Sequence, residues 1–201
     1  LEWALKLGAQ MFTIHVPKVP VGLMVKGTET WEKISSAYYD LFHPYINEIN
    51  VNIENMHMTK GEKDDEYRRF GYTPVECISL VNEMNHLMNT SNFKILLDAG
   101  HARNNAPYSE KYPLSAWYNL TGRLIGGYHL HQVVMAEGSM ENHMPFTDLF
   151  GSLISLGGFI WAWNNNIINR APVFLEIRNY HESYKCYLRL KEIIGQNPDL
   201  I

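Results

Sequence analysis

Five short apolar runs in this chain end at, or carry, an acidic residue or a histidine. These residues are His15 after MFTI, Glu54 after VNI, Asp98 after FKILL, His129 and His131 in LIGGYHLH, and Glu176 in PVFLEIR. Each run is rich in β-branched or aromatic residues and is followed by a polar loop and a helix-like stretch. This alternation is typical of successive βα units of a parallel α/β barrel. Because the active end of such a barrel is the carboxyl end of its strands, the five runs predict one shared site, which a divalent metal could hold together.

The spacing of apolar residues along the chain predicts its strands and helices. The predicted strands cover about 11–16, 50–55, 93–98, 124–133 and 172–178, and the predicted helices lie near 30–43, 74–89, 148–156 and 183–194. Gly8 ends a helical stretch at the start of the chain, and Gly195 is expected to end the last helix. The clearest helix start is Thr73-Pro74-Val75-Glu76, where Thr73 caps, Pro74 occupies the first helical position and Glu76 completes a capping box.

Length and the number of units predict an incomplete barrel. Five units in 201 residues are about 40 residues each, and a complete (β/α) barrel has eight units in about 250 residues. We therefore expect a single TIM-barrel domain over 1–201 that comprises the last five βα units and lacks the N-terminal strands. The open edges of such an arc favour aggregation or pairing with another chain, so we expect low stability by itself, and a homo-oligomer is compatible with the sequence.

Composition restricts the partners and the setting. The net charge of −4 and the pI near 6.1 give no basic footprint, which disfavours nucleic acid as a partner. Cys77 and Cys186 are too few for a disulfide framework, which favours a reducing, cytoplasmic setting. No apolar run approaches the roughly 20 residues of a membrane span, so we expect no membrane partner.

Asp98 and His101 form the first candidate pair. The segment Asp98-Ala99-Gly100-His101 places a carboxylate at a strand end and an imidazole one turn later, and Gly100 permits a close backbone approach. Both side chains could therefore face one cavity. The alternative is an Asp that only caps the next helix, beside an exposed His.

Other candidates sit in the last two runs and in the second. His129 and His131 are two residues apart, so on a strand they share a side, and two inward imidazoles need a polar partner or a metal. Glu54 and Glu176 lie in apolar strands, where an uncompensated carboxylate would cost several kcal/mol, and a metal ion or Arg178 could compensate it. Glu141 and His143 follow in a predicted loop, for which simple solvation is an equal alternative.

Six segments together resemble the xylose-isomerase-like TIM barrels, the superfamily of sugar phosphate isomerases/epimerases and endonuclease IV. These segments are LGAQMFTIHV, VNIENM, LLDAGHA, GGYHLHQV, ENHMPF and VFLEIR, in family order and covering nearly the whole chain. The resemblance implies that the metal site of the epimerase branch is formed by Glu54, Asp98, His129 and Glu176. The positions that endonuclease IV uses for additional zinc ions match His15, His101, Glu141 and His143, with Glu141 in place of the more usual Asp.

The sequence departs from the family pattern in three places. The Gly-x-Gly stretch that commonly follows the loop histidine is absent after His143. Gln132 stands where many members have Asp. The opening strands of the barrel, with one histidine that the nuclease needs, are not in the chain. These departures bear on the substrate more than on the fold.

The resemblance implies a divalent-metal-dependent sugar or polyol isomerase/epimerase. Three carboxylates and one imidazole form an oxygen-rich site that suits Mn²⁺, Mg²⁺ or Co²⁺. Glu54 and Glu176 would remove and return a proton through a cis-enediolate. Hydroxyls or a phosphate of the small-molecule substrate would be oriented by His101, His131, Arg178 and Lys60.

Three other functions stay open. The resemblance also admits a polyol dehydratase. An endonuclease IV-like zinc phosphodiesterase is favoured by the extra histidines and disfavoured by the acidic net charge. A degenerate barrel that binds a sugar without turnover is disfavoured, because metal ligands without a metal would be buried unpaired charge.

Overall fold

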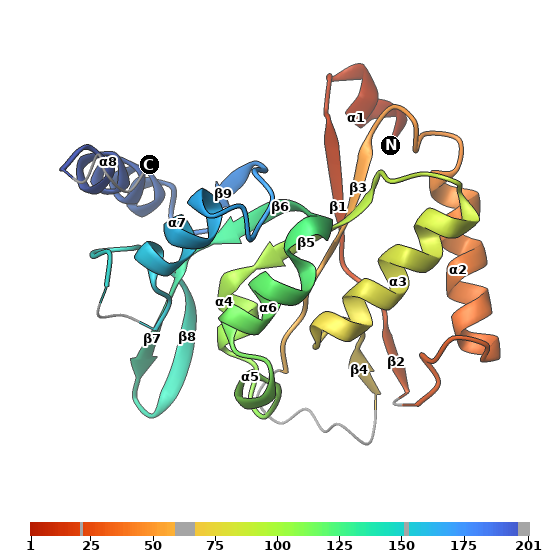
Figure 1. Cartoon of the computed structure of the whole chain (residues 1–201), viewed down its shortest axis with the longest axis horizontal. Coiled ribbons are helices and arrows are strands. Elements are labelled where there is room, and N and C mark those ends of the chain that lie inside the picture. Colours follow the sequence, from red (N-terminus) through yellow and green to blue (C-terminus); the bar gives the residue numbers. More distant parts are fainter. Residues whose placement is uncertain (21, 59–66, 151–152, 197–201) are drawn as a thin grey trace. The chain divides into compact units, whose positions relative to one another are not determined.

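The computed structural model describes residues 1–20, 22–58, 67–150 and 153–196. The chain divides into two compact units, Leu1–Leu96 and Leu97–Ile201. Both units are built from strands that alternate with helices, as the sequence predicts (Figure 1).

Five strands form the main sheet, and their order in it is their order along the chain. They are β1 (Met11–Ile14), β3 (Asn50–Glu54), β5 (Phe93–Asp98), β6 (Ile125–Leu130) and β9 (Val173–Leu175). The pairs β1–β3, β3–β5 and β6–β9 are parallel. Parallel strands joined in sequence by helices are consecutive βα units. The predicted fold class, an α/β TIM barrel represented by five of its units, is therefore confirmed.

The first unit also contains three helices and a small antiparallel pair. These elements are α1 (Glu2–Lys6), α2 (Glu29–Phe42), α3 (Pro74–Leu87), β2 (Lys18–Pro20) and β4 (Tyr67–Arg69). Helices α2 and α3 pack against each other (Figure 1). Strands β3 and β5 are almost entirely buried. In β5 this burial accounts for a nearly continuous apolar run, whereas in β3 the apolar Val51 and Ile53 alternate with asparagines. The T-shaped contact of Phe42 with Phe93, with ring centroids 5.6 Å apart, joins α2 to the sheet.

The predicted start of α3 is confirmed in detail. The Thr73 side chain accepts a hydrogen bond from the Glu76 backbone N–H, and Pro74 occupies the first helical position. The Glu76 carboxylate turns back and accepts from the backbone N–H groups of Gly71 and Tyr72. These bonds satisfy N–H groups that a helix start leaves without intrahelical partners.

The second unit follows β5. Its further elements are α4 (Ala99–Arg103), α5 (Tyr108–Lys111), α6 (Leu114–Thr121), the 3₁₀ turn η1 (Gly122–Leu124), β7 (Gln132–Ala136), β8 (Ser139–Met144), α7 (Leu156–Asn164) and α8 (Tyr180–Gln196). No helix among the described residues is long and apolar enough to cross a membrane. Cys77 in the first unit and Cys186 in the second are buried free thiols.

The fourth predicted strand is wrong at its end. It was expected to run from 124 to 133 and to be followed by a loop, but β6 ends at Leu130, and Gln132 begins the antiparallel hairpin β7–β8. Glu137 and Gly138 both have positive φ, 46° and 77°. This is the turn conformation that matches the twist of a two-stranded hairpin. Glu141 and His143 therefore lie on a strand and not in a loop.

Two predicted helices and the last strand also differ from the structure. The helix expected over 148–156 is instead α7, because the Ser155 side chain caps its start by accepting from Gly158 N–H. Helix α8 begins at Tyr180 and not at 183, because the Asn179 side chain accepts hydrogen bonds from the backbone N–H groups of His181 and Glu182. The helix also continues through Gly195 to Gln196, so Gly195 does not end it. Strand β9 is shorter than the predicted 172–178 and leaves Glu176 directly after its end.

Candidate metal centre

Asp98 lies at the carboxyl end of β5 and at the start of α4. Its Oδ1 accepts a hydrogen bond from the His101 backbone N–H at 2.7 Å, so it caps the helix as the alternative reading proposed. His101 is nevertheless buried, and its Nδ1 lies 3.7 Å from Asp98 Oδ2. Burial alone would raise the pKa of Asp98, but the charges and hydrogen bonds of His101 and His131 outweigh it and hold this pKa well below the ordinary value. Asp98 is therefore an anionic centre inside the protein.

His131 lies immediately after β6 and fixes the position of Asp98. Its Nε2 lies 3.1 Å from Asp98 Oδ1 and 3.3 Å from Oδ2. Its Nδ1 accepts the backbone N–H of His143 at 2.9 Å, which is closer than the Gln132 carbonyl at 3.3 Å. This contact assigns the imidazole proton to Nε2, which donates it to Asp98. Burial lowers the pKa of His131, but the hydrogen bond to Asp98, the charges of Asp98 and Glu176 and the Gln132 carbonyl together outweigh burial and raise this pKa.

Gly100 is required by the place that His131 occupies. A Cβ at position 100 would stand 1.9 Å from His131 Cε1. No side chain fits in that space, because real Cβ atoms do not approach other atoms so closely. The close approach that the sequence predicted at Gly100 is thus confirmed, and its partner is an imidazole.

His129 and Glu176 complete a cluster with Asp98. His129 Nδ1 lies 3.2 Å from Glu176 Oε2 and 3.8 Å from Asp98 Oδ2. Ligand atoms of the three residues all lie within 4.8 Å of one another. They come from the ends of β5, β6 and β9, which are the positions where the sequence predicts convergence. Two carboxylates and an imidazole at this spacing are a suitable donor set for a divalent cation.

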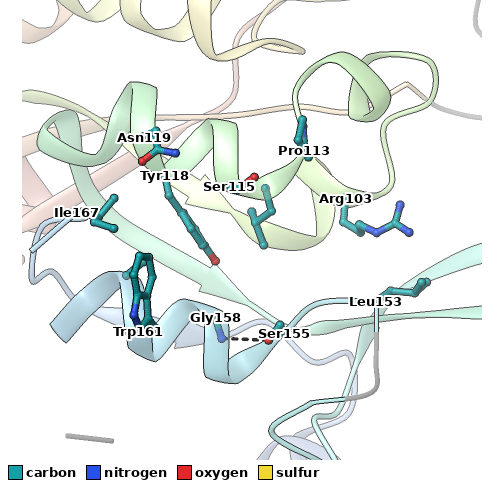
Figure 2. Close-up of a pocket in the computed structure, with 12 residues that line it drawn as sticks. Arg103, Pro113, Ser115, Tyr118, Asn119, Leu153, Ser155, Gly158, Trp161 and Ile167 are labelled. Atoms are coloured by element: carbon teal, nitrogen blue, oxygen red, sulfur yellow. Dashed lines mark hydrogen bonds between the residues drawn. The ribbon is translucent and has the colours of Figure 1, made fainter. Parts of the chain in front are cut away.

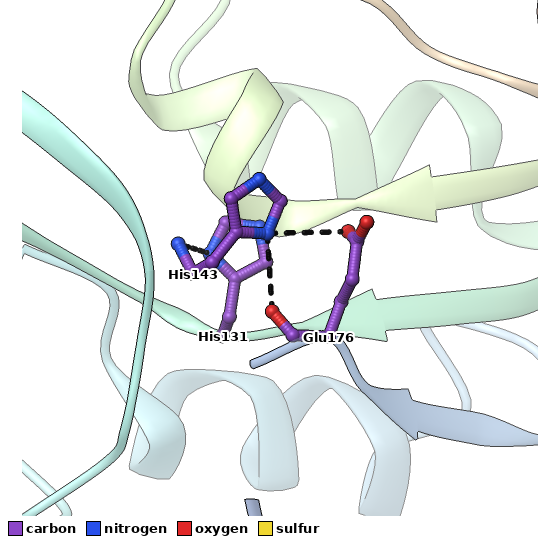
Figure 3. Close-up of side chains that lie close together, drawn as sticks. All are labelled: His131, His143 and Glu176. Atoms are coloured by element: carbon purple, nitrogen blue, oxygen red, sulfur yellow. Dashed lines mark hydrogen bonds and ion pairs between the residues drawn. The ribbon is translucent and has the colours of Figure 1, made fainter. Parts of the chain in front are cut away.

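His143 adds a second group of ligand atoms beside the first. His131, His143 and Glu176 also place ligand atoms within 4.8 Å of one another (Figure 3). The rings of His131 and His143 stack with centroids 4.5 Å apart. His143 Nδ1 lies 3.1 Å from the Glu176 carbonyl oxygen and 3.6 Å from its carboxylate Oε2. Glu176 is therefore shared between the two groups.

Glu54 and His15 lie in the first unit. Glu54 ends β3 and is 3% exposed, and its Oε2 lies 3.1 Å from Nε2 of the exposed His15. In the parallel pairing of β3 with β5, Glu54 is in register with Leu96. Leu96 precedes Asp98 by two residues on the same strand. His15, directly after β1, and Glu54 are thus both at strand ends, as the sequence predicts.

Three further candidates lie apart from these groups. Glu141 is exposed on β8, where it pairs in register with Val134. Arg178 is exposed and forms no ion pair with another residue in the described part of the chain. Lys60 lies outside the described residues. Solvation, the alternative for the 141–143 segment, therefore applies to Glu141 but not to His143.

Sequence reasoning missed two polar residues that tie the β7–β8 hairpin to neighbouring segments. The Gln132 side chain donates to the Ile154 carbonyl and accepts from the backbone N–H groups of Ile154 and Val133. Gln132 therefore links the start of β7 to the segment before α7. In the hairpin, Asn142 accepts a hydrogen bond from the Asn104 side chain at 2.9 Å. The signal in the sequence was the amide side chain itself. Gln132 stood at the end of the predicted fourth strand, and Asn142 stood in the predicted loop that follows it.

Comparison with known proteins gives likeness in structure and not in sequence. No protein-family model matches the chain, and no curated protein matches it. A D-tagatose 3-epimerase-like protein matches with 16% identity and a TM-score of 0.64 over 98% of this chain and 67% of that chain. D-allulose 3-epimerase from Methylomonas sp. matches with 16% identity and a TM-score of 0.58 over 97% of this chain and 65% of that one. A xylose isomerase-like TIM barrel protein from Mycobacterium smegmatis, in complex with magnesium, matches with 12% identity and a TM-score of 0.58 over 96% of this chain and 63% of that chain. The chain thus spans about two thirds of the length of these proteins.

Proposed function

Because the chain has the fold of the xylose-isomerase-like TIM barrels, we propose that it is a divalent-metal-dependent sugar or polyol isomerase/epimerase. The observation that carries the proposal is the convergence of Asp98, His129 and Glu176 within 4.8 Å at the ends of three strands. Two carboxylates and an imidazole so close together are held most simply by a cation. The solved structures with this fold include sugar epimerases and a magnesium complex.

Glu54 is the fourth ligand in this proposal. It is a buried carboxylate at the end of β3, the strand that pairs with β5. Its Oε2 lies 3.1 Å from Nε2 of the exposed His15. A site of Glu54, Asp98, His129 and Glu176 has three carboxylates and one imidazole, so it favours Mn²⁺, Mg²⁺ or Co²⁺ over metals that prefer sulfur or several imidazoles.

The protein's own residues divide into proton carriers and positioning groups. A bound cation would polarise adjacent carbonyl and hydroxyl oxygens of a ketose and thereby acidify the C–H between them. Glu54 and Glu176 are the two carboxylates that remove the proton and return it to the opposite face. His131 holds Asp98 through its Nε2–H, and the His143 backbone holds His131. His101 provides a polar side chain beside Asp98 for a substrate hydroxyl.

Proton exchange with solvent tests this function directly. The protein is loaded with Mn²⁺ and incubated in D₂O with D-tagatose or D-allulose, the ketoses in the names of two similar structures. We expect deuterium at C3 and formation of the C3 epimer, both abolished by EDTA and restored by Mn²⁺. Elimination of water from the sugar would instead identify the related dehydratase. Absence of exchange and elimination with every ketose and polyol of a broad panel would contradict the proposal.

A zinc phosphodiesterase like endonuclease IV is the second candidate. The group of His131, His143 and Glu176 favours it, because it offers imidazoles for a second cation next to the first. Against it, both nitrogens of His131 are already engaged, one by Asp98 and the other by the His143 N–H. Hydrolysis of bis(p-nitrophenyl) phosphate by the zinc-loaded protein, without ketose exchange, would support this second function.

A further inference from the structure

The second unit contains a cavity of about 390 Å³ that shares no lining residue with the metal centre. It lies between α6 and α7 (Figure 2). Its apolar walls include Leu114, Leu153, Trp161, Ala162 and Ile167. A volume of this size falls within the range of sites that hold small organic molecules.

Tyr118 brings a hydrogen-bonding group into this apolar space. Its side chain projects from α6, and its hydroxyl end points toward Ser155 and Gly158 of the α7 segment (Figure 2). The residue is 7% exposed. Its hydroxyl oxygen is buried and has no hydrogen-bond partner among the described residues. Because burial raises the pKa of Tyr118 well above its ordinary value, the hydroxyl stays protonated and available as a donor.

The other polar groups of the lining do not satisfy this hydroxyl. The Ser155 Oγ accepts the Gly158 N–H at 3.0 Å as the cap of α7. Arg103 lies at the side of the cavity, with its guanidinium directed away from Tyr118 (Figure 2). A buried hydroxyl without a partner is unfavourable, and such groups in native proteins usually bind a water molecule or a ligand.

We infer that this cavity binds a small, largely apolar molecule that carries one carbonyl-type oxygen, which accepts the hydrogen bond of Tyr118. The apolar walls account for the body of the ligand, and the single buried donor accounts for its one acceptor. Gly158 contributes to the fit, since it lines the cavity without a side chain. The inference is independent of the proposed isomerase function, because the two sites use different residues.

A matched pair of probes tests the inference. Acetophenone and α-methylstyrene have the same shape, but only acetophenone has a carbonyl oxygen. Binding to the metal-loaded protein is measured by isothermal titration calorimetry. We expect acetophenone to bind about tenfold more tightly than α-methylstyrene, which corresponds to one buried hydrogen bond.

Two variants assign the binding to the cavity. Tyr118→Phe keeps the shape of the ring, and we expect it to make the two probes bind equally. Ala162→Leu fills space at a buried wall position, and we expect it to weaken both probes at least tenfold while a cooperative thermal melt shows that the variant is folded. The inference is overturned if acetophenone shows no saturable binding, if its advantage persists in Tyr118→Phe, or if a crystal structure places only an ordered water on the Tyr118 hydroxyl and acetophenone elsewhere.

Discussion

Gly100 and His131 are so close that a Cβ at position 100 would stand 1.9 Å from His131 Cε1. Gly100→Ala must therefore move either α4 or the imidazole that holds Asp98. We expect this substitution to lower the free energy of unfolding by about 1–3 kcal/mol, the usual effect of overpacking, and to weaken metal binding. Urea unfolding and metal titration measure the two effects.

Gly195→Ala is the matched control for this substitution. Gly195 is also a helical glycine, but a Cβ there would meet nothing within 4 Å. We expect no loss of stability, and a gain of up to about 1 kcal/mol from helix propensity. Equal stability of Gly100→Ala and Gly195→Ala would show that His131 can move without cost.

His131→Phe tests whether His131 positions Asp98. Phenylalanine keeps an aromatic ring beside His143 but cannot donate to Asp98, so the carboxylate loses the bond at 3.1 Å. We expect metal affinity to fall about 10- to 100-fold, as is usual when the hydrogen-bond partner of a ligand is removed. His181→Phe, at an exposed position of α8, is the control and should leave affinity unchanged. Unaltered affinity in His131→Phe would refute the positioning role.

Gln132→Glu tests the link between β7 and the segment before α7. A carboxylate cannot donate to the Ile154 carbonyl, which now receives the amide at 3.0 Å, and position 132 is buried. We expect a loss of about 1–3 kcal/mol in the free energy of unfolding near neutral pH. Gln10→Glu, at an exposed position, should change stability by less than about 0.5 kcal/mol. If both variants melt alike, the Gln132 amide contributes nothing to stability.

Glu176→Gln separates proton transfer from metal binding. The amide oxygen can still coordinate a cation, but it cannot accept a proton. We expect turnover of the true substrate to fall by at least about 100-fold, while the fold and part of the metal affinity remain. Retention of full activity would exclude Glu176 as a proton carrier.

The sequence predicts β3 and β5 well because both strands are almost entirely buried. The run that ends at Asp98 is nearly continuous and apolar, and the run that ends at Glu54 carries Val51 and Ile53 between asparagines. Both β3 and β5 match their predicted bounds to within a residue. The start of α3 is equally predictable, because Thr73 and Glu76 act through local hydrogen bonds and Pro74 acts through its fixed φ. Local chemistry of this kind requires no knowledge of the tertiary contacts.

The sequence-based predictions fail where contacts between distant segments determine the local structure. The hairpin after β6 depends on the turn at Glu137–Gly138 and on the pairing of the apolar segment QVVMA with the mostly polar segment SMENHM, and neither segment shows the regular alternation of a half-buried strand. Glu141 was therefore expected in a loop with His143, and the structure leaves Glu141 exposed. The tautomer of His131 follows from a backbone N–H twelve residues away, which periodicity does not reveal.

Metal stoichiometry tests the central claim most directly. The purified chain is stripped with EDTA, titrated with Mn²⁺ and Zn²⁺ in separate experiments, and analysed for bound metal after gel filtration, beside Asp98→Asn. We predict one Mn²⁺ per chain for the unaltered protein and at least tenfold weaker binding in Asp98→Asn, because Asp98 is the fully buried carboxylate of the cluster. Absence of Mn²⁺ binding, or two to three tightly bound Zn²⁺ ions per chain, would contradict a single-metal isomerase/epimerase centre.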